Sequence, residues 1–74
     1  MLKKAQEWVE QGNRLDTRGQ FEEAIAAYDN ALAIIPGDAD AIFDKGETLA
    51  KLGKIPEAMK CFETATQLSI SGLG

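Results

Sequence analysis

The sequence contains no histidine and only one cysteine, and both shortages limit the chemistry open to it. Histidine is the usual general base and the commonest metal ligand of proteins, so serine–histidine and cysteine–histidine catalysis are excluded. Cys61 cannot form a disulfide within the chain, and it has no histidine with which to build a zinc site. We therefore expect a protein that is not an enzyme and holds no metal and no cofactor.

The chain also lacks a block of basic residues and a long apolar run. Its 8 Lys and Arg residues are outnumbered by 12 Asp and Glu residues, which gives a net charge of −4 and argues against a nucleic-acid partner. The first ten residues have charged and polar side chains among the apolar ones, so they lack the unbroken apolar stretch of a signal peptide or a membrane span. We therefore expect a cytoplasmic protein with a reduced thiol and no membrane partner.

What the sequence does contain is an internal repeat with a period of 34 residues. Shifting the chain by this period places apolar residues on apolar residues, as with Tyr28 and Phe62, and the matches follow helical spacing. The identical pairs are Ala5 and Ala39, Gly12 and Gly46, Leu15 and Leu49, Gly19 and Gly53, Glu23 and Glu57, Ala24 and Ala58, and Ala31 and Ala65.

Apolar residues three and four positions apart predict four helices separated by short breaks. Gly19 and Gly53 fall at equivalent breaks, where a glycine in the left-handed conformation ends a helix. Asp38 is the expected N-cap of the third helix. The predicted helices cover about residues 2–17, 21–35, 39–52 and 55–69.

Each 34-residue unit is therefore predicted to form one antiparallel helical hairpin. Gly12 and Gly46 fall in the middle of a helix, where glycine costs about 1 kcal/mol relative to alanine. A glycine repeated at such a position suggests that a neighbouring helix approaches closely, with Ala24 and Ala58 as the small residues opposite. A chain of this length without a staple must gain its stability from hairpins stacked on one another.

With this period and these residues, the chain resembles two tandem tetratricopeptide repeats. Gln11 and Leu15 replace the leucine and tyrosine that are usual in the first repeat, and Ile70 replaces the proline that is usual at the end of the second. Pentatricopeptide repeats, which bind RNA, have nearly the same period, but the acidic charge argues against them. The matching positions are Trp8, Gly12, Ala24, Tyr28 and Pro36, then Ile42, Gly46, Leu49, Ala58, Phe62 and Ala65.

The resemblance implies an all-α fold, a right-handed α–α superhelix or solenoid of two antiparallel helical hairpins. The repeats would occupy residues 1–37 and 38–70, followed by a flexible C-terminal tail at 71–74. In this family the first helix of each repeat lines a concave groove that receives a partner peptide. The resemblance therefore implies groove positions at Gln6, Val9, Glu10, Asn13, Asp16 and Thr17, and at Asp40, Phe43, Asp44, Glu47, Ala50 and Lys51.

Five of these groove residues are acidic, and Val9 and Phe43 form an apolar centre between them. We therefore predict that the partner is a protein or peptide with a basic and apolar segment. Phe43 would be the main contact, because a partly desolvated aromatic can dominate binding energy. The alternative is that Phe43 packs under a neighbouring helix and the acids form an ordinary solvated face.

Chaperone-binding members of the family hold a C-terminal carboxylate with lysine and asparagine side chains. Here only Asn13 matches those residues, and Glu10, Asp44 and Glu47 would repel a carboxylate, so this partner is excluded. Asp38, Asp40 and Asp44 form a small acidic group that could be considered as a cation site. Their spacing lacks the glycine and the bidentate glutamate of a calcium loop. We interpret that group as an N-cap with first-turn acids.

The leading hypothesis is a protein–protein interaction module. The alternative is a structural role, as a stacking or self-association unit or a fragment of a longer repeat array. Two repeats are fewer than the three that independent stability usually needs, and a terminal repeat needs a polar outer face. On this alternative, Met59, Phe62 and Leu68 lie on an uncovered edge, and the second repeat is the surface of self-association.

Overall fold

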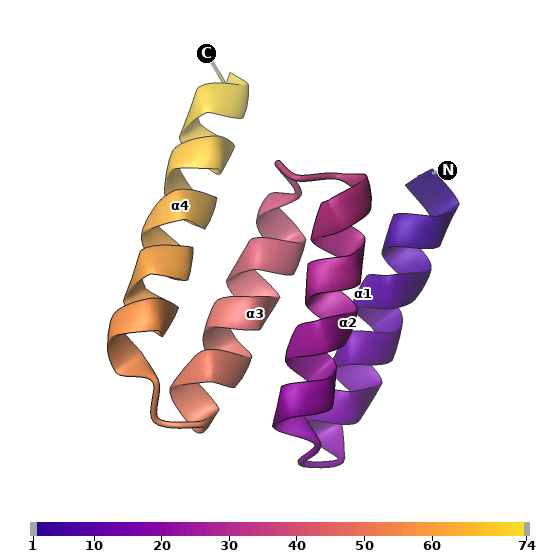
Figure 1. Ribbon diagram of the computed structural model, residues 1–74. Coiled ribbons are helices and arrows are strands. Elements are labelled where there is room, and N and C mark those ends of the chain that lie inside the picture. Colours follow the sequence, from indigo (N-terminus) through magenta and orange to yellow (C-terminus); the bar gives the residue numbers. More distant parts are fainter. Residues whose placement is uncertain (1, 74) are drawn as a thin grey trace.

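The computed structural model consists of four α-helices joined by short turns. It describes residues 2–73, and the side chains of residues 4–70. The helices lie side by side, with α1 paired to α2 and α3 paired to α4 in antiparallel hairpins, and α2 packs against α3 (Figure 1). The predicted all-α class and hairpin solenoid are confirmed. The helices are α1 (Leu2–Thr17), α2 (Phe21–Ile34), α3 (Ala39–Lys51) and α4 (Ile55–Leu73).

The turns inside the two hairpins have the same geometry. Gly19 and Gly53 have φ angles of 82° and 84°, in the left-handed region that other residues avoid. The backbone N–H of Gln20 donates to the carbonyl of Leu15 at 2.9 Å, and the second turn repeats this bond at the same distance. These bonds satisfy carbonyls that the end of a helix leaves free, which confirms both predicted glycine breaks.

The connection between the hairpins ends in a capped helix. The carboxylate of Asp38 accepts hydrogen bonds from the backbone N–H groups of Asp40 at 3.1 Å and Ala41 at 3.3 Å. These are two of the donors that the first turn of α3 cannot satisfy internally. The predicted N-cap is therefore confirmed, and it fixes the start of α3 beside the first hairpin.

Small residues dominate the core and let the helices approach closely. Among the side chains of residues 4–70, seven of the ten buried apolar ones are alanines, and Tyr28 is the largest that is fully buried. Because alanine side chains are small, a large side chain such as that of Tyr28 can extend from its own helix to the neighbouring one. The buried apolar residues are Ala5, Ala24, Ala27, Tyr28, Ala31, Ala41, Ile42, Leu49, Ala58 and Ala65.

Gly12 and Gly46 mark the closest approaches within the hairpins. A Cβ atom added at Gly12 would lie 2.5 Å from a ring carbon of Tyr28, and one at Gly46 would lie 2.8 Å from a ring carbon of Phe62. The predicted close approach is confirmed, but the nearest atoms belong to these aromatic rings and not to Ala24. An aromatic side chain is long enough to cross the hairpin and cover a helix that has no Cβ at that point.

The last helix is longer than the sequence pattern predicts. It continues to Leu73, past the expected end near Ser69 and through most of the predicted flexible tail at 71–74. Gly72 costs the helix about 1 kcal/mol, but a glycine does not end a helix by itself when no proline follows. Neither α4 nor another helix in the described part of the chain has an apolar stretch long enough to cross a membrane.

Candidate functional site

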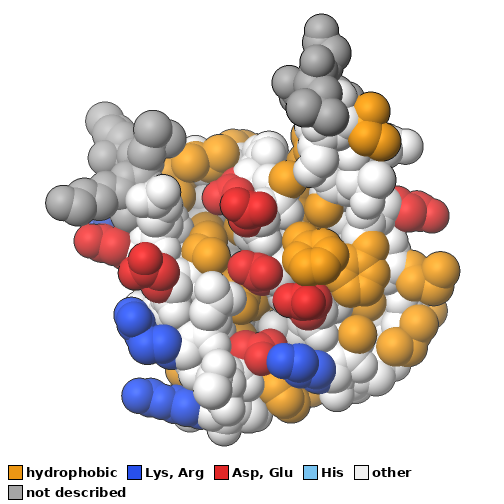
Figure 2. All heavy atoms as spheres, turned by 180° about the vertical axis from the view of Figure 1, so that it is seen from behind, with side chains coloured by type: hydrophobic (Ala, Val, Ile, Leu, Met, Phe, Trp, Pro, Cys, Tyr) orange, Lys and Arg blue, Asp and Glu red, His pale blue; other side chains and the backbone are white. Residues whose placement is uncertain are grey.

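The first helices of the two hairpins, α1 and α3, line one face of the molecule. At one end of this face is a hollow of about 610 Å³, to which Gln6, Val9 and Glu10 of α1 and Asp40 of α3 contribute. Figure 2 shows acidic side chains gathered at the centre of this face beside hydrophobic ones. Four of the groove residues predicted from the sequence thus lie around one hollow.

The hollow also has residues that the helical pattern did not include. Ile35, Gly37 and Asp38, from the connection between α2 and α3, complete its wall. The groove positions were counted along the first helices alone, so a connecting segment could not enter the prediction. The N-cap signal at Asp38 was available in the sequence, and it places that residue at the start of α3 and therefore at this end of the groove.

Phe43 lies in a neighbouring hollow and not under another helix. Its side chain is 47% exposed, and its ring packs against the Phe62 ring at 5.3 Å between centroids, tilted by 49°. The hollow beside it, of about 270 Å³, shares Asp40 with the first and is otherwise lined mainly by residues of α4 such as Ile70. Val9 and Phe43 therefore occupy adjacent hollows rather than a single apolar centre.

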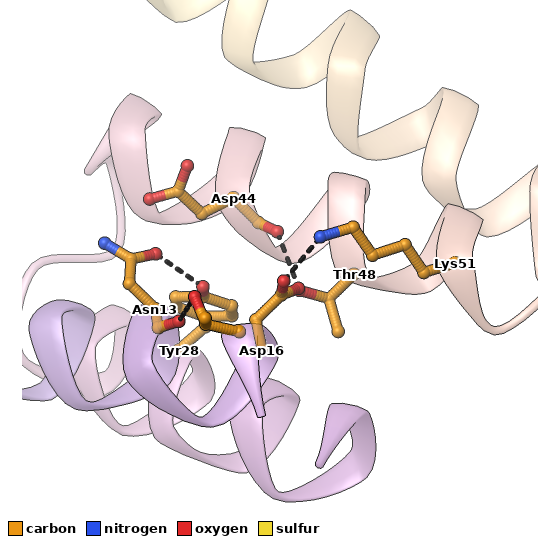
Figure 3. Close-up of polar contacts among 7 residues, drawn as sticks. Asn13, Asp16, Tyr28, Asp44, Thr48 and Lys51 are labelled. Atoms are coloured by element: carbon orange, nitrogen blue, oxygen red, sulfur yellow. Dashed lines mark hydrogen bonds and ion pairs between the residues drawn. The ribbon is translucent and has the colours of Figure 1, made fainter. Parts of the chain in front are cut away.

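A polar cluster joins α1 to α3 at the other end of the groove. The carboxylate of Asp16 accepts hydrogen bonds from the hydroxyl of Thr48 and the ammonium of Lys51 (Figure 3). Burial raises the pKa of Asp16, but the hydrogen bonds and charge of Lys51 and the Thr48 hydroxyl outweigh it, so that this pKa is lowered. Asp16 is thus anionic and already paired within the chain.

Asp44 is the groove carboxyl whose ionised form is disfavoured by its surroundings. It is half-buried, and this burial, followed by the charges of Glu47, Asp40 and other nearby acids, raises its pKa to about 6. A carboxyl with this pKa is only partly ionised near pH 6. A cation placed beside Asp44 would stabilise the ionised form.

Asn13 is held by the core of the first hairpin. The hydroxyl of Tyr28 donates to the side-chain oxygen of Asn13 at 2.6 Å, and burial, followed by the charge of Asp44, raises the pKa of Tyr28 to about 12. Tyr28 therefore stays a hydrogen-bond donor at neutral pH. Among the other predicted groove positions, Thr17 donates to the backbone of Asn13 at 3.0 Å, and Glu47 is exposed.

The side of the molecule away from the groove carries the single cysteine. Cys61 is half-buried, and burial raises its pKa, so it is a weaker nucleophile than a free thiol. It lines a hollow of about 620 Å³ between α2, α3 and α4, across which Lys45 pairs with Asp29 at 2.7 Å. The arrangement agrees with a packing role for Cys61.

The fold and the groove define a repeat protein built from stacked helical hairpins. Comparison with known families agrees, since the tetratricopeptide repeat model matches residues 17–68. The chain belongs to the tetratricopeptide repeat family. Membership identifies it as a protein–protein interaction module, and repeats of this kind are typically non-catalytic.

The chain is also similar to two known proteins, and the second of them is named for its TPR repeats. The chain is 33% identical over 61 residues to the uncharacterized protein MJ0572 of Methanocaldococcus jannaschii, and the match covers 82% of this chain and 71% of that protein. It is 40% identical over 53 residues to the inactive TPR repeat-containing thioredoxin TTL3 of Arabidopsis thaliana. The second match covers 70% of this chain but only 8% of the plant protein.

Proposed function

We propose that the chain binds a basic, apolar segment of a partner protein through the groove between α1 and α3. The observation that supports this best is the group of acids beside the two hollows. Glu10 and Asp40 line the first hollow, and burial, followed by the charges of Glu47 and Asp40, raises the pKa of Asp44. A lysine or arginine of the partner would relieve the repulsion between these acids, which form no ion pair with the side chains of residues 4–70 and so favour a cationic ligand.

The apolar part of the proposed ligand would bind beside Phe43. About half of the Phe43 side chain is exposed, and the adjoining hollow gives a small apolar side chain a place against Ala65 and Ile70. Contact at both sites would require a segment that places its basic and apolar residues next to each other. Aromatic residues at the centre of a contact often supply much of its binding energy.

Chemical-shift mapping with a peptide of alternating lysine and leucine tests the proposal. We expect perturbations on α1 and α3, together with Ala65 and Ile70 of α4, and perturbations confined to α2 and α4 would refute the groove assignment. Phe43→Ala and Glu47→Lys should each weaken binding about tenfold. Glu23→Lys makes the same charge change at an exposed site of α2 and should have little effect, while circular dichroism checks that each variant is folded.

Proton release gives a second test that does not depend on a variant. If a cation of the peptide lies beside Asp44, binding at pH 6 should lower the pKa of that carboxyl and release a fraction of a proton. Calorimetry in buffers of different ionisation enthalpy measures this fraction. Binding without proton release at pH 6 would place the peptide away from Asp44.

Self-association through the second repeat is a second candidate function, and the exposure of α4 favours it. Ile55 and Met59 are 49% and 57% exposed, whereas Phe21 and Ile25, their counterparts one repeat earlier, are half-buried beside α3. Of the other residues predicted on this edge, Phe62 and Leu68 are half-buried. A mass that stays monomeric in sedimentation up to millimolar concentration would exclude this candidate.

A further inference from the structure

The internal repeat shows what kind of element fits the open side of α4. The first hairpin offers α2 as a packing surface, and α3 covers it. One repeat later, α4 offers Ile55 and Met59 in the same places, and both are largely exposed. Figure 1 shows α4 at one end of the row of helices and α1 at the other. The helix that fits α4 is therefore one that resembles α3.

Within this chain, α1 is the counterpart of α3. Ile42 and Leu49 are buried in α3, and the equivalent residues of α1, Trp8 and Leu15, are only half-buried. A packing surface alongside α1 would bury them further, as α2 and α4 bury their counterparts in α3. The side of α1 that corresponds to the covered side of α3 also carries the exposed residue Gln11.

Polar groups at the two ends agree with the same arrangement. Lys45 of α3 pairs with Asp29 of α2 at 2.7 Å. One repeat away, the corresponding residues are Gln11 on α1 and Glu63 on α4, a hydrogen-bond donor and an acceptor, and both are exposed. The Asp16 carboxylate has no such counterpart, because Ala50 takes its place in the second repeat. The contact between copies should therefore be weaker than the contact between the two hairpins of one copy.

We infer that a second copy of this chain packs its α1 against α4 of the first, so that the copies continue the helical stack head to tail. The inference rests on the second candidate function and names the surface of the partner copy. A head-to-tail contact uses two different surfaces, so a dimer still has one unoccupied surface at each of its ends. Assemblies should therefore grow beyond dimers as the concentration rises.

Sedimentation equilibrium of the wild type, four single variants and one double variant tests the inference. Met59→Lys should weaken association by about tenfold or more, because it places a charge in the apolar contact. Gln11→Lys should strengthen association about two- to fivefold by restoring an ion pair, and Gln11→Glu should weaken it by a similar factor. Glu63→Lys should also weaken it, and the double variant with Gln11→Glu should restore it. All three sites are exposed, so circular dichroism should show unchanged helicity.

The outcomes separate this inference from the two proposed functions. A dimer that does not grow further, is weakened by Met59→Lys and is unaffected at Gln11 would mean that two second repeats face each other. That result would overturn the head-to-tail contact and keep self-association. A wild type that is monomeric at every concentration would overturn both, and peptide binding in the groove would remain a separate question.

Discussion

Replacement of Gly12 by alanine should destabilise the protein, although alanine is the better helix former. The new Cβ would lie 2.5, 2.8 and 2.9 Å from three ring atoms of Tyr28, distances that real Cβ contacts essentially never show. The ring cannot give way easily, because it is 1% exposed and its hydroxyl is bound to Asn13 at 2.6 Å. Overpacking of this kind costs about 1–3 kcal/mol, against a gain of about 1 kcal/mol in helix propensity.

The expected net loss for Gly12→Ala is therefore about 1 kcal/mol in the free energy of unfolding. For a domain of this size, that loss corresponds to a fall in Tm of about 4–8 °C. Urea and thermal unfolding followed by circular dichroism at 222 nm measure both quantities. A variant as stable as the wild type, or more stable, would refute the argument that the Tyr28 ring is held in place.

Two other glycines provide matched controls. Gly46→Ala would meet the Phe62 ring at 2.8 Å and the Cβ of Cys61 at 3.0 Å, but the Phe62 ring is half-buried, whereas the Tyr28 ring is fully buried. The Phe62 ring can move more easily than the Tyr28 ring, so the loss in stability should be smaller than for Gly12→Ala, at about 0.5 kcal/mol. Gly37→Ala meets no atom within 4 Å and should be neutral or stabilising by up to about 1 kcal/mol. The free energy of unfolding should therefore be lowest for Gly12→Ala, higher for Gly46→Ala and highest for Gly37→Ala, because the space for the added methyl group increases in that order.

Two carboxyl groups of the groove should affect stability with opposite dependence on pH. Asp16→Ala should cost about 1–2 kcal/mol at pH 7, because the buried Thr48 hydroxyl keeps only the Asp44 backbone carbonyl, at 3.2 Å. The pKa of Asp16 is lowered by folding, so this cost should shrink as the pH falls below about 4 in urea titrations, and a constant cost down to pH 2 would contradict it. Asp44→Asn should instead stabilise the protein at pH 7 by up to about 1 kcal/mol, allowing for solvent screening of a half-exposed group. The pKa of Asp44 is raised to about 6, so the gain should vanish between pH 6 and pH 4, and an equal gain at both ends would contradict the argument.

The sequence predicted those parts of the fold that depend on local signals. Gly19 and Gly53 end their helices as expected, and Asp38 caps α3, because each effect involves only the nearest turn of backbone. The residue facing Gly12 was not predicted, because it depends on which side chain of α2 is long enough to cross the hairpin. The end of α4 was not predicted either, since a glycine late in a helix weakens it without stopping it.

The candidate groove residues followed from the resemblance to the repeat family, which implies positions along α1 and α3. The structure places three of them, Gln6, Glu10 and Asp40, around one hollow. Periodicity cannot reveal that Asp16 is already paired with Lys51, because that contact joins residues 35 positions apart. The distinction matters for binding, since a paired carboxylate is a poorer receptor for a partner's lysine than a free one.

The position of the Asp16 cluster has a consequence for the motion of the groove. The hydrogen bonds described between α1 and α3 all end on Asp16, near the C-terminal ends of both helices. The hollow lined by Gln6 and Asp40 lies near their N-terminal ends. A small rotation of one hairpin against the other about the Asp16 cluster would therefore change the width of the groove mostly at the hollow. The groove can then adjust to partner residues of different size at the end lined by Gln6 and Asp40, while its width stays constant at the end held by Asp16.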